Sequence, residues 1–211
     1  MTRRRGIASV TLILLALLTL LSGCGGIDKP YPVKKAYVLD VSRPEGTPPT
    51  DEKAILLIRR FRTAPPYENQ GFVYRTGELQ YESDFYNEFF SPPAALLADQ
   101  TRQWLQASQL VRLVIGAGLP TEATHSLEGQ VYALYGDYRR PDDSRAVLGI
   151  QFFVSRLGDT PEVVFHKDYR QQVPVNGRSP EALTAAWNRG LQQILTDLEA
   201  DLRAGPFKPG P

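Results

Sequence analysis

The first 24 residues constrain this chain most, because they combine an export signal with its only cysteine. Three arginines at positions 3–5 precede an apolar run over residues 7–21, and Ser22-Gly23 then leads to Cys24. A basic start, a short apolar segment and small residues before a cleavage point are typical of a secretory signal peptide. The run of about 15 residues is shorter than the roughly 20 that a membrane-spanning helix needs. We therefore predict a signal peptide over residues 1–23, followed by a domain that folds without an internal disulfide.

Residues 21–24, Leu-Ser-Gly-Cys, resemble the bacterial lipobox. The resemblance implies that the Cys24 thiol receives a diacylglycerol, so Cys24 is our predicted lipidation site and its acyl chains would hold the protein to a membrane. Residues 24–35, rich in glycine and proline, then form the lipidated N-terminus and a short tether. Gly25 stands where an aspartate would mark inner-membrane retention in enterobacterial lipoproteins, which favours the periplasmic face of the outer membrane over the inner membrane. The alternative is a secreted protein with one stray thiol.

Charge and length limit the function classes. The chain has 24 basic and 23 acidic side chains, and three of the arginines belong to the predicted signal. The exported part is therefore slightly acidic, which argues against a nucleic-acid partner because such a binder would present a basic surface. The remaining length fits one domain with a full core.

Apolar patterns along the chain predict an α+β fold: an antiparallel-rich, mixed β-sheet with two main helices packed on one face, in a single domain over residues 36–203. A Ser-Pro pair should start each helix, with Ser91 and Ser179 as the N-caps. Gly205-Pro206 should end the second helix, leaving residues 204–211 as a flexible tail. The expected strands are 36–41, 54–61, a hairpin of 72–75 with 79–82, then 111–115, 127–135, 146–155 and 163–173, and the expected helices are 91–108 and 179–204.

Catalytic signatures are scarce. The two histidines, His125 and His166, lie in strand-like sequence, and neither the Gly-x-Ser-x-Gly nor the His-Glu-x-x-His pattern occurs. The acidic residues lack the spacing of a calcium loop. We expect no catalytic residue, no metal site and no cofactor, and hence no enzyme.

Residues 72–90 concentrate aromatic side chains among charged ones. Tyrosines beside charges are typical of protein interfaces. We predict a partner-binding surface that includes Tyr74, Arg75, Tyr81 and Tyr86. The alternative is that the aromatic residues of this stretch fill the core, which would bury Phe72, Tyr74, Phe85 and Phe89.

Several segments together resemble the ABC-type transport auxiliary lipoproteins, the paraquat-inducible protein C type that is encoded beside mammalian-cell-entry (MCE) transport systems. The resemblance covers nearly the whole exported chain, although many members carry tryptophan near Phe89-Phe90. The segments that carry it are Tyr37-Val38-Leu39, Phe72-Val73-Tyr74-Arg75, Gln80-Tyr81, the run from Phe85 to Pro93, Leu127-Glu128-Gly129-Gln130-Val131 and the closing helix.

This resemblance implies a non-catalytic outer-membrane lipoprotein that serves an ABC-powered path for lipid or another hydrophobic solute. Its partner would be the periplasmic MCE-domain protein of the transporter, and it could act as a homo-oligomer. Two alternatives come from other classes. One is a lipoprotein activator of a cell-wall synthase, which often needs a longer tether than the one here. The other is a periplasmic hydrolase with His166 and Asp168 in a cleft.

Overall fold

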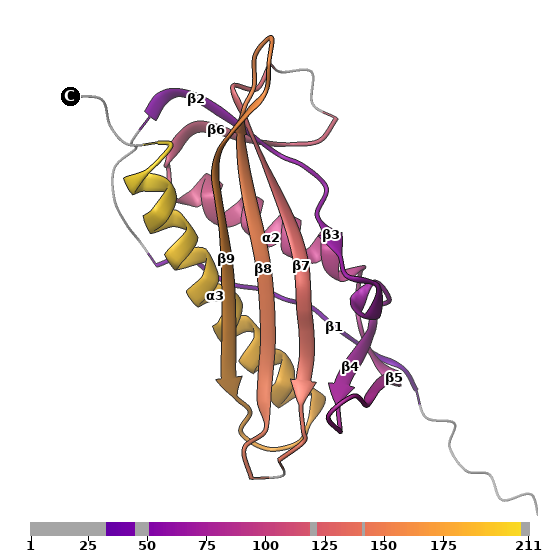
Figure 1. Cartoon of the computed structure of the whole chain (residues 1–211). Helices are drawn as coiled ribbons and strands as arrows, with labels where there is room; N and C mark the ends of the chain where they lie inside the picture. The colour runs from indigo at the N-terminus through magenta and orange to yellow at the C-terminus, as the bar shows by residue number, and fades with distance from the viewer. Residues whose placement is uncertain (1–32, 45–50, 119–121, 141, 208–211) are drawn as a thin grey trace, which may run out of the picture. The chain divides into compact units, whose positions relative to one another are not determined.

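The computed structural model describes residues 33–44, 51–118, 122–140 and 142–207 (Figure 1). The predicted signal peptide, Cys24 and most of the predicted tether lie outside the described residues. Residues Lys34–Pro211 form one compact unit. Its elements are β1 (Lys35–Tyr37), β2 (Asp51–Ile58), β3 (Arg62–Thr63), the short 3-10 helix η1 (Pro65–Tyr67), β4 (Gly71–Arg75), β5 (Tyr81–Phe89), α2 (Pro93–Ala107), β6 (Val111–Gly116), β7 (His125–Asp137), β8 (Arg145–Arg156), β9 (Glu162–Pro174) and α3 (Pro180–Ala204).

Strand β7 is the centre of a nine-stranded mixed sheet. On one edge it pairs with β8, which pairs in turn with β9, and both long ladders are antiparallel. On the other edge of β7, three strands run parallel to it and pair with it: β2, β3 and β4. β6 lies outside β2, and β5 and then β1 lie outside β4. The predicted α+β class with a mixed sheet is confirmed, and β2 is central because it pairs on both edges.

A bulge in β7 changes which side chains share a face of the sheet. Val131 lies opposite Ile150 and Ala133 lies opposite Gly149, so Tyr132 is an extra residue on β7 with no opposite residue on β8. Because side chains alternate, the extra residue moves Ala133 and Tyr135 to the face opposite Val131. The expectation that the regular alternation of residues 127–135 continues through this point is therefore wrong. The five apolar residues predicted to share one face of β8 are all buried: Ala146, Leu148, Ile150, Phe152 and Val154.

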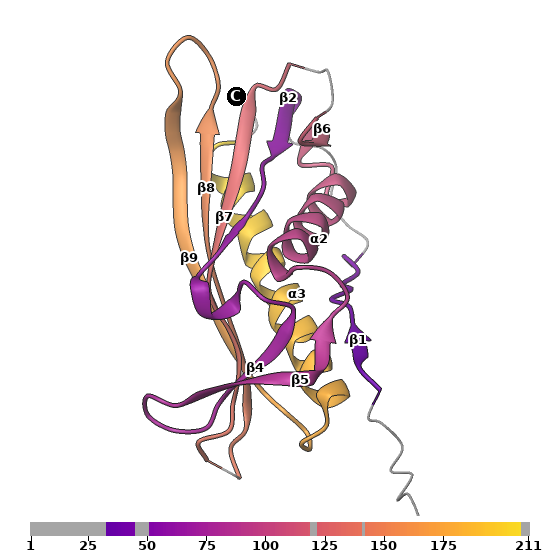
Figure 2. The same cartoon turned by 90° about the vertical axis from the view of Figure 1, so that its right-hand side faces the viewer.

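Both helices lie on the same side of the long strands, as predicted (Figure 2). The predicted apolar stripe of α3 is buried throughout and forms much of the core: Leu183, Ala186, Trp187, Gly190, Leu191, Ile194, Leu195 and Leu198. Phe207 follows the helix, in the segment predicted to be a flexible tail, and it is fully buried with its backbone N–H bonded to the Leu202 carbonyl. Within the described residues, no helix is both long and apolar enough to cross a membrane.

The two Ser-Pro helix starts behave differently. Ser179 caps α3 as predicted, because its hydroxyl accepts a hydrogen bond from the Ala182 backbone N–H at 3.1 Å. In α2 the N-cap is Pro92, and no side chain caps the helix. The second proline explains the difference, since a residue before proline is pushed out of the helical region and Pro92 is extended at ψ 134°. The prediction of Ser91 as N-cap is therefore wrong.

The predicted strand 36–41 ends early, at Tyr37, and residues 38–44 continue without regular secondary structure along the two helices. We call residues 38–44 the strap. Helix side chains take the place of a neighbouring strand: Asn188 accepts from the Asp40 N–H and Gln100 accepts from the Val41 N–H. The strap ends in a buried ion pair between Arg43 and Glu199 of α3, at 2.7 Å. The same carboxylate accepts from Trp104 of α2 and from Arg203.

Candidate functional site

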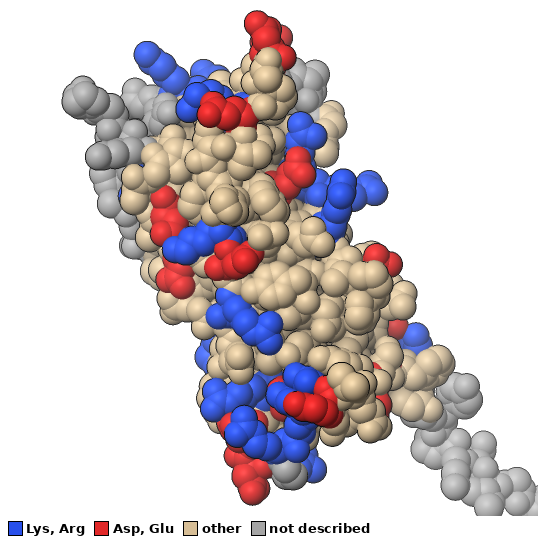
Figure 3. All heavy atoms as spheres, in the orientation of Figure 1, with Lys and Arg blue, Asp and Glu red and all other residues tan. Residues whose placement is uncertain are grey.

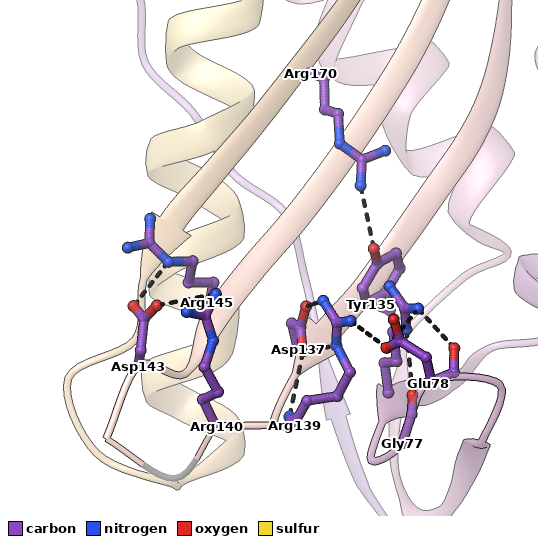
Figure 4. A network of polar contacts seen from close by, with 10 residues as sticks. Gly77, Glu78, Tyr135, Asp137, Arg139, Arg140, Asp143, Arg145 and Arg170 are labelled. Carbon is purple, nitrogen blue, oxygen red and sulfur yellow. Dashed lines mark hydrogen bonds and ion pairs between the residues drawn. The ribbon is translucent and has the colours of Figure 1, made fainter.

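The strands β4 and β5 form the predicted hairpin, with Arg75 opposite Tyr81. Arg75 closes the turn by donating to the carbonyls of Gly77 and Glu78. The Glu78 carboxylate also binds Arg139 at 2.7 Å, and Arg139 makes a two-pronged contact with Asp137 at the end of β7 (Figure 4). This chain of contacts ties the tip of the hairpin to the central strand, although the outer members are exposed and each contact of this kind stabilises only modestly.

A bulge of several residues interrupts the pairing of β5 with β4. Val73 lies opposite Ser83, but Gly71 lies opposite Glu88, so residues 84–87 have no regular partners on β4. The Asp84 carboxylate organises these residues. It accepts hydrogen bonds from the backbone N–H groups of Tyr86 and Asn87, from the Asn87 side chain and from the Tyr74 hydroxyl, at 2.7–3.0 Å.

The bulge turns two neighbouring aromatic rings outward. Phe85 is 63% exposed and Tyr86 is 43% exposed, and the two rings meet edge to face at 5.2 Å. The Lys34 ammonium lies 4.8 Å from the Phe85 ring centre and binds Glu88 at 2.8 Å. We call Phe85 and Tyr86 the aromatic pair. Three further exposed side chains extend along the hairpin and its exit: Leu79, Tyr81 and Phe90.

The four predicted interface residues divide into two groups. Tyr81 and Tyr86 are exposed, whereas Tyr74 and Arg75 are half-buried and bonded within the hairpin. The alternative of a buried stretch is right for Phe72 and Phe89 but wrong for Phe85. Phe85, Phe90 and Leu79 are surface residues that the sequence pattern did not indicate. The available signal was Asp84 followed by Asn87, since short polar side chains that bond nearby backbone interrupt regular strands.

Burial opposes ionisation of Asp84, but the hydrogen bonds from Tyr74, Asn87 and Tyr86 outweigh it and hold the pKa of this carboxyl below its usual value. The Tyr74 hydroxyl shows the converse, because burial and then its bond to Asp84 raise its pKa. Asp84 therefore stays charged and Tyr74 stays protonated near neutral pH, which is the pair of states that the hydrogen bond requires.

Replacing Asp84 with alanine should lower the free energy of unfolding by about 1–3 kcal/mol, because it removes the acceptor that four donors share. Equilibrium urea unfolding measures the change. The matched control is Asp168→Ala, at an exposed position of β9, where we expect a change within about 0.5 kcal/mol. Equal effects of the two substitutions would show that Asp84 does not organise the bulge.

The histidines lie away from this hairpin. His166 is exposed on β9 with its ring stacked on Phe153, and Asp168 is exposed two residues further on. His125 lies at the start of β7, where its ring meets Phe207 edge-on and Nδ1 is 2.9 Å from the Thr124 hydroxyl. Among the described residues, no group of three histidine, cysteine or carboxylate side chains is placed to hold a metal ion.

Comparison with known proteins assigns the chain to a family. The model of the ABC-type transport auxiliary lipoprotein component matches residues 37–199. A crystal structure of a protein from Xanthomonas campestris has a TM-score of 0.69 and 17% identity, covering 78% of this chain and 92% of that one. A second solved structure, of an uncharacterized protein, has a TM-score of 0.65 and 15% identity, covering 81% and 99% of the two chains. At these identities the likeness concerns the fold alone.

No curated protein matches the sequence at a significant level. The family match nevertheless spans most of the chain and includes the hairpin, the bulge, α2 and most of α3. It confirms the resemblance that the aromatic segments indicated. The protein belongs to the family of ABC-type transport auxiliary lipoprotein components.

Proposed function

We propose that this protein is the non-catalytic outer-membrane lipoprotein of an MCE-type transport path, which moves lipid or another hydrophobic solute between two membranes. In this role it docks the periplasmic MCE-domain protein of the ABC transporter. Membership of the transport auxiliary family supports the general role. The docking role rests on the aromatic pair.

The aromatic pair has the properties of a protein-binding surface. Large aromatic side chains are enriched in interfaces, and tyrosine is among the residue types that most often dominate the binding energy there. Exposing a phenylalanine to water is unfavourable, and here the fold builds a bulge that exposes Phe85. Because the bonds to Asp84 already fix the backbone of the bulge, a partner would not have to order it on binding.

The position of the pair also fits a membrane-anchored docking protein. β1 pairs with β5 at residues Asn87–Phe89, so the chain enters the fold beside the aromatic pair. Only about ten residues separate the predicted acylated Cys24 from Lys34, and they span at most roughly 35 Å when extended. A lipid anchor on Cys24 would therefore hold the aromatic pair near the membrane surface, where the end of a periplasmic transport protein would arrive.

Replacing Phe85 and Tyr86 together with serine tests the docking role. We expect recovery of the MCE partner with the tagged lipoprotein to fall about 30-fold or more, since one lost hot-spot residue costs about 2 kcal/mol. Thermal unfolding should change little, because both rings are exposed. Co-purification from membranes of cells that produce both proteins provides the measurement.

The control is Val163→Ser, which removes an exposed apolar side chain from β9, on a different part of the sheet. It should leave partner recovery unchanged. Full recovery of the partner by the double serine variant would contradict docking through the aromatic pair. An equal loss in both variants would assign the binding to general surface hydrophobicity.

A further inference from the structure

A second surface carries several arginines over an apolar hollow. It lies where the chain passes from β2 to β3, through Arg59-Arg60-Phe61-Arg62. Phe61 turns inward and is buried, with its ring edge-on to Phe152 at 5.8 Å. The three arginines of this segment are exposed. Figure 3 shows basic side chains projecting at the edge of the molecule beside this segment.

Next to these arginines is a hollow of about 450 Å³ between the β2 end of the sheet and the first turns of α2. A volume of this size is within the usual range for small-molecule sites. Three alanines on α2 leave the space open, because a larger side chain at any of these positions would fill it. The apolar lining is Ile58, Phe61, Pro92, Ala94, Ala95, Ala98, Gly116 and Ala117, and the polar rim is Arg59, Arg60, Asp99 and Arg102.

Two neighbouring hollows continue this surface, and Arg60 lines all three. The surface is positively charged, since four arginines face two carboxylates. Arg102 is paired with Asp99 at 2.8 Å, and Arg59 has a long, exposed pair with Glu128 at 3.4 Å. Among the described residues, the side chains of Arg60 and Arg62 have no hydrogen-bond or ion-pair partner. We call this surface the arginine groove.

We propose that the arginine groove binds an anionic amphiphile, with an alkyl chain in the apolar hollow and an acidic headgroup on Arg60 and Arg62. The alkyl chain removes apolar lining from water. Guanidinium groups match carboxylate and phosphate oxygens, so a fatty acid and a phosphorylated lipid share the required chemistry. The site goes beyond the proposed docking role and shares no residue with the aromatic pair.

Photolabelling of the full chain tests the site directly. The protein is held in nanodiscs of phosphatidylcholine, a zwitterionic lipid without net charge, and irradiated with dodecanoate or dodecyl phosphate that carries a diazirine at the chain end. Both probes should label the first turns of α2 or residues 58–61. The corresponding dodecanol should label about tenfold less, because it lacks the charge that the arginines bind. The ratio of the two anionic probes shows whether carboxylate or phosphate is preferred.

Variants separate the headgroup contact from the hollow. Arg60→Gln with Arg62→Gln should reduce labelling by the anionic probes about tenfold, while Arg112→Gln, at an exposed position of β6 outside the groove, should not. Ala98→Trp should abolish labelling by filling the hollow. If that variant melts early, Ala95→Trp fills the hollow from an exposed position.

Several results would overturn the proposal: equal labelling by dodecanol, labelling elsewhere, or unchanged labelling in a folded variant with the hollow filled. Competition by polyglutamate but not by octyl phosphate would assign the arginines to an acidic protein instead. Recovery of the MCE partner is measured in parallel. We expect the Arg60 and Arg62 variant to keep it, so that failure of this site and failure of the docking role give different results.

Discussion

Replacing Glu199 with alanine should lower the free energy of unfolding by about 3–5 kcal/mol, the usual effect of removing one partner from a buried ion pair. The carboxylate is buried and accepts hydrogen bonds from Arg43, Trp104 and Arg203. Without it, the partly buried guanidinium of Arg43 loses its carboxylate partner, and the end of the strap loses its attachment to α3. Equilibrium urea unfolding measures the loss.

The control on the same helix is Glu181→Ala. Glu181 is exposed and bonds Tyr37 and Lys35, so we expect a much smaller loss than for Glu199→Ala, because water screens exposed contacts. If Glu199→Ala and Glu181→Ala were equally mild, the buried network would not be holding the strap. Hydrogen exchange at the Val41 amide, which bonds Gln100, gives an independent reading of whether the strap has loosened.

The same carboxylate predicts a pH dependence. Burial raises the pKa of Glu199, but the hydrogen bonds from Arg43, Arg203 and Trp104 together lower it by more than burial raises it. The net shift of the pKa is therefore downward. A carboxyl with a lowered pKa in the folded protein contributes stability above its unfolded pKa of about 4.3, and loses that contribution as the pH falls through the folded value. The difference in free energy of unfolding between the wild type and Glu199→Ala should therefore shrink as the pH falls below about 4.3. A difference that grew on acidification would contradict this sign.

Replacing Trp187 with alanine should lower the free energy of unfolding by about 3–5 kcal/mol, the usual cost of a large cavity in a core. The Trp187 ring of α3 is buried and lies 5.0 Å from the ring of Phe72 and 5.4 Å from that of Phe89. Its indole N–H also donates to the Val147 carbonyl at 3.2 Å. One residue thus joins α3, the β4–β5 hairpin and strand β8.

The matched control is Phe85→Ala, which removes an aromatic ring from the same hairpin on its exposed side. We expect a change within about 0.5 kcal/mol there. Hydrogen exchange should show that Trp187→Ala weakens protection of β4 and β5 more than that of β8 and β9. Uniform weakening across the whole sheet would show that Trp187 supports the core without a particular role under the hairpin.

Elements that depend on local periodicity were predictable from the sequence. The stripe of α3 repeats every three to four residues over the length of the helix, and one face of β8 alternates regularly, so burial followed from the pattern alone. The Ser179 cap was also predictable, because a serine before a single proline has no competitor for that position. The N-cap of α2 was not predictable in this way, because the second proline moves it from Ser91 to Pro92.

Other features of the fold could not be predicted from the sequence pattern, because they depend on residues that are far away in the chain. The strap reads as a strand, yet its hydrogen-bond partners are side chains on two helices. The bulge of β7 becomes visible only through its register with β8. At the hairpin, composition identified the correct segment, but a single carboxylate at Asp84 decides which aromatic side chains face outward. The parallel pairings of β2, β3 and β4 with β7 likewise join residues that lie 62–69 positions apart in the chain.

The direction of β1 has a mechanical consequence. If the N-terminal segment is attached to a membrane, any pull on the domain enters through β1, which lies parallel to β5 and pairs with it at three successive positions. A force along the strand loads these pairings in shear, so they resist together and do not open one at a time. The load then passes along the strap to Arg43 and Glu199, which connect it to α3. The domain thus has a tension-bearing path from its N-terminal end into its longest helix, and the hairpin that carries the aromatic pair lies beside the start of that path.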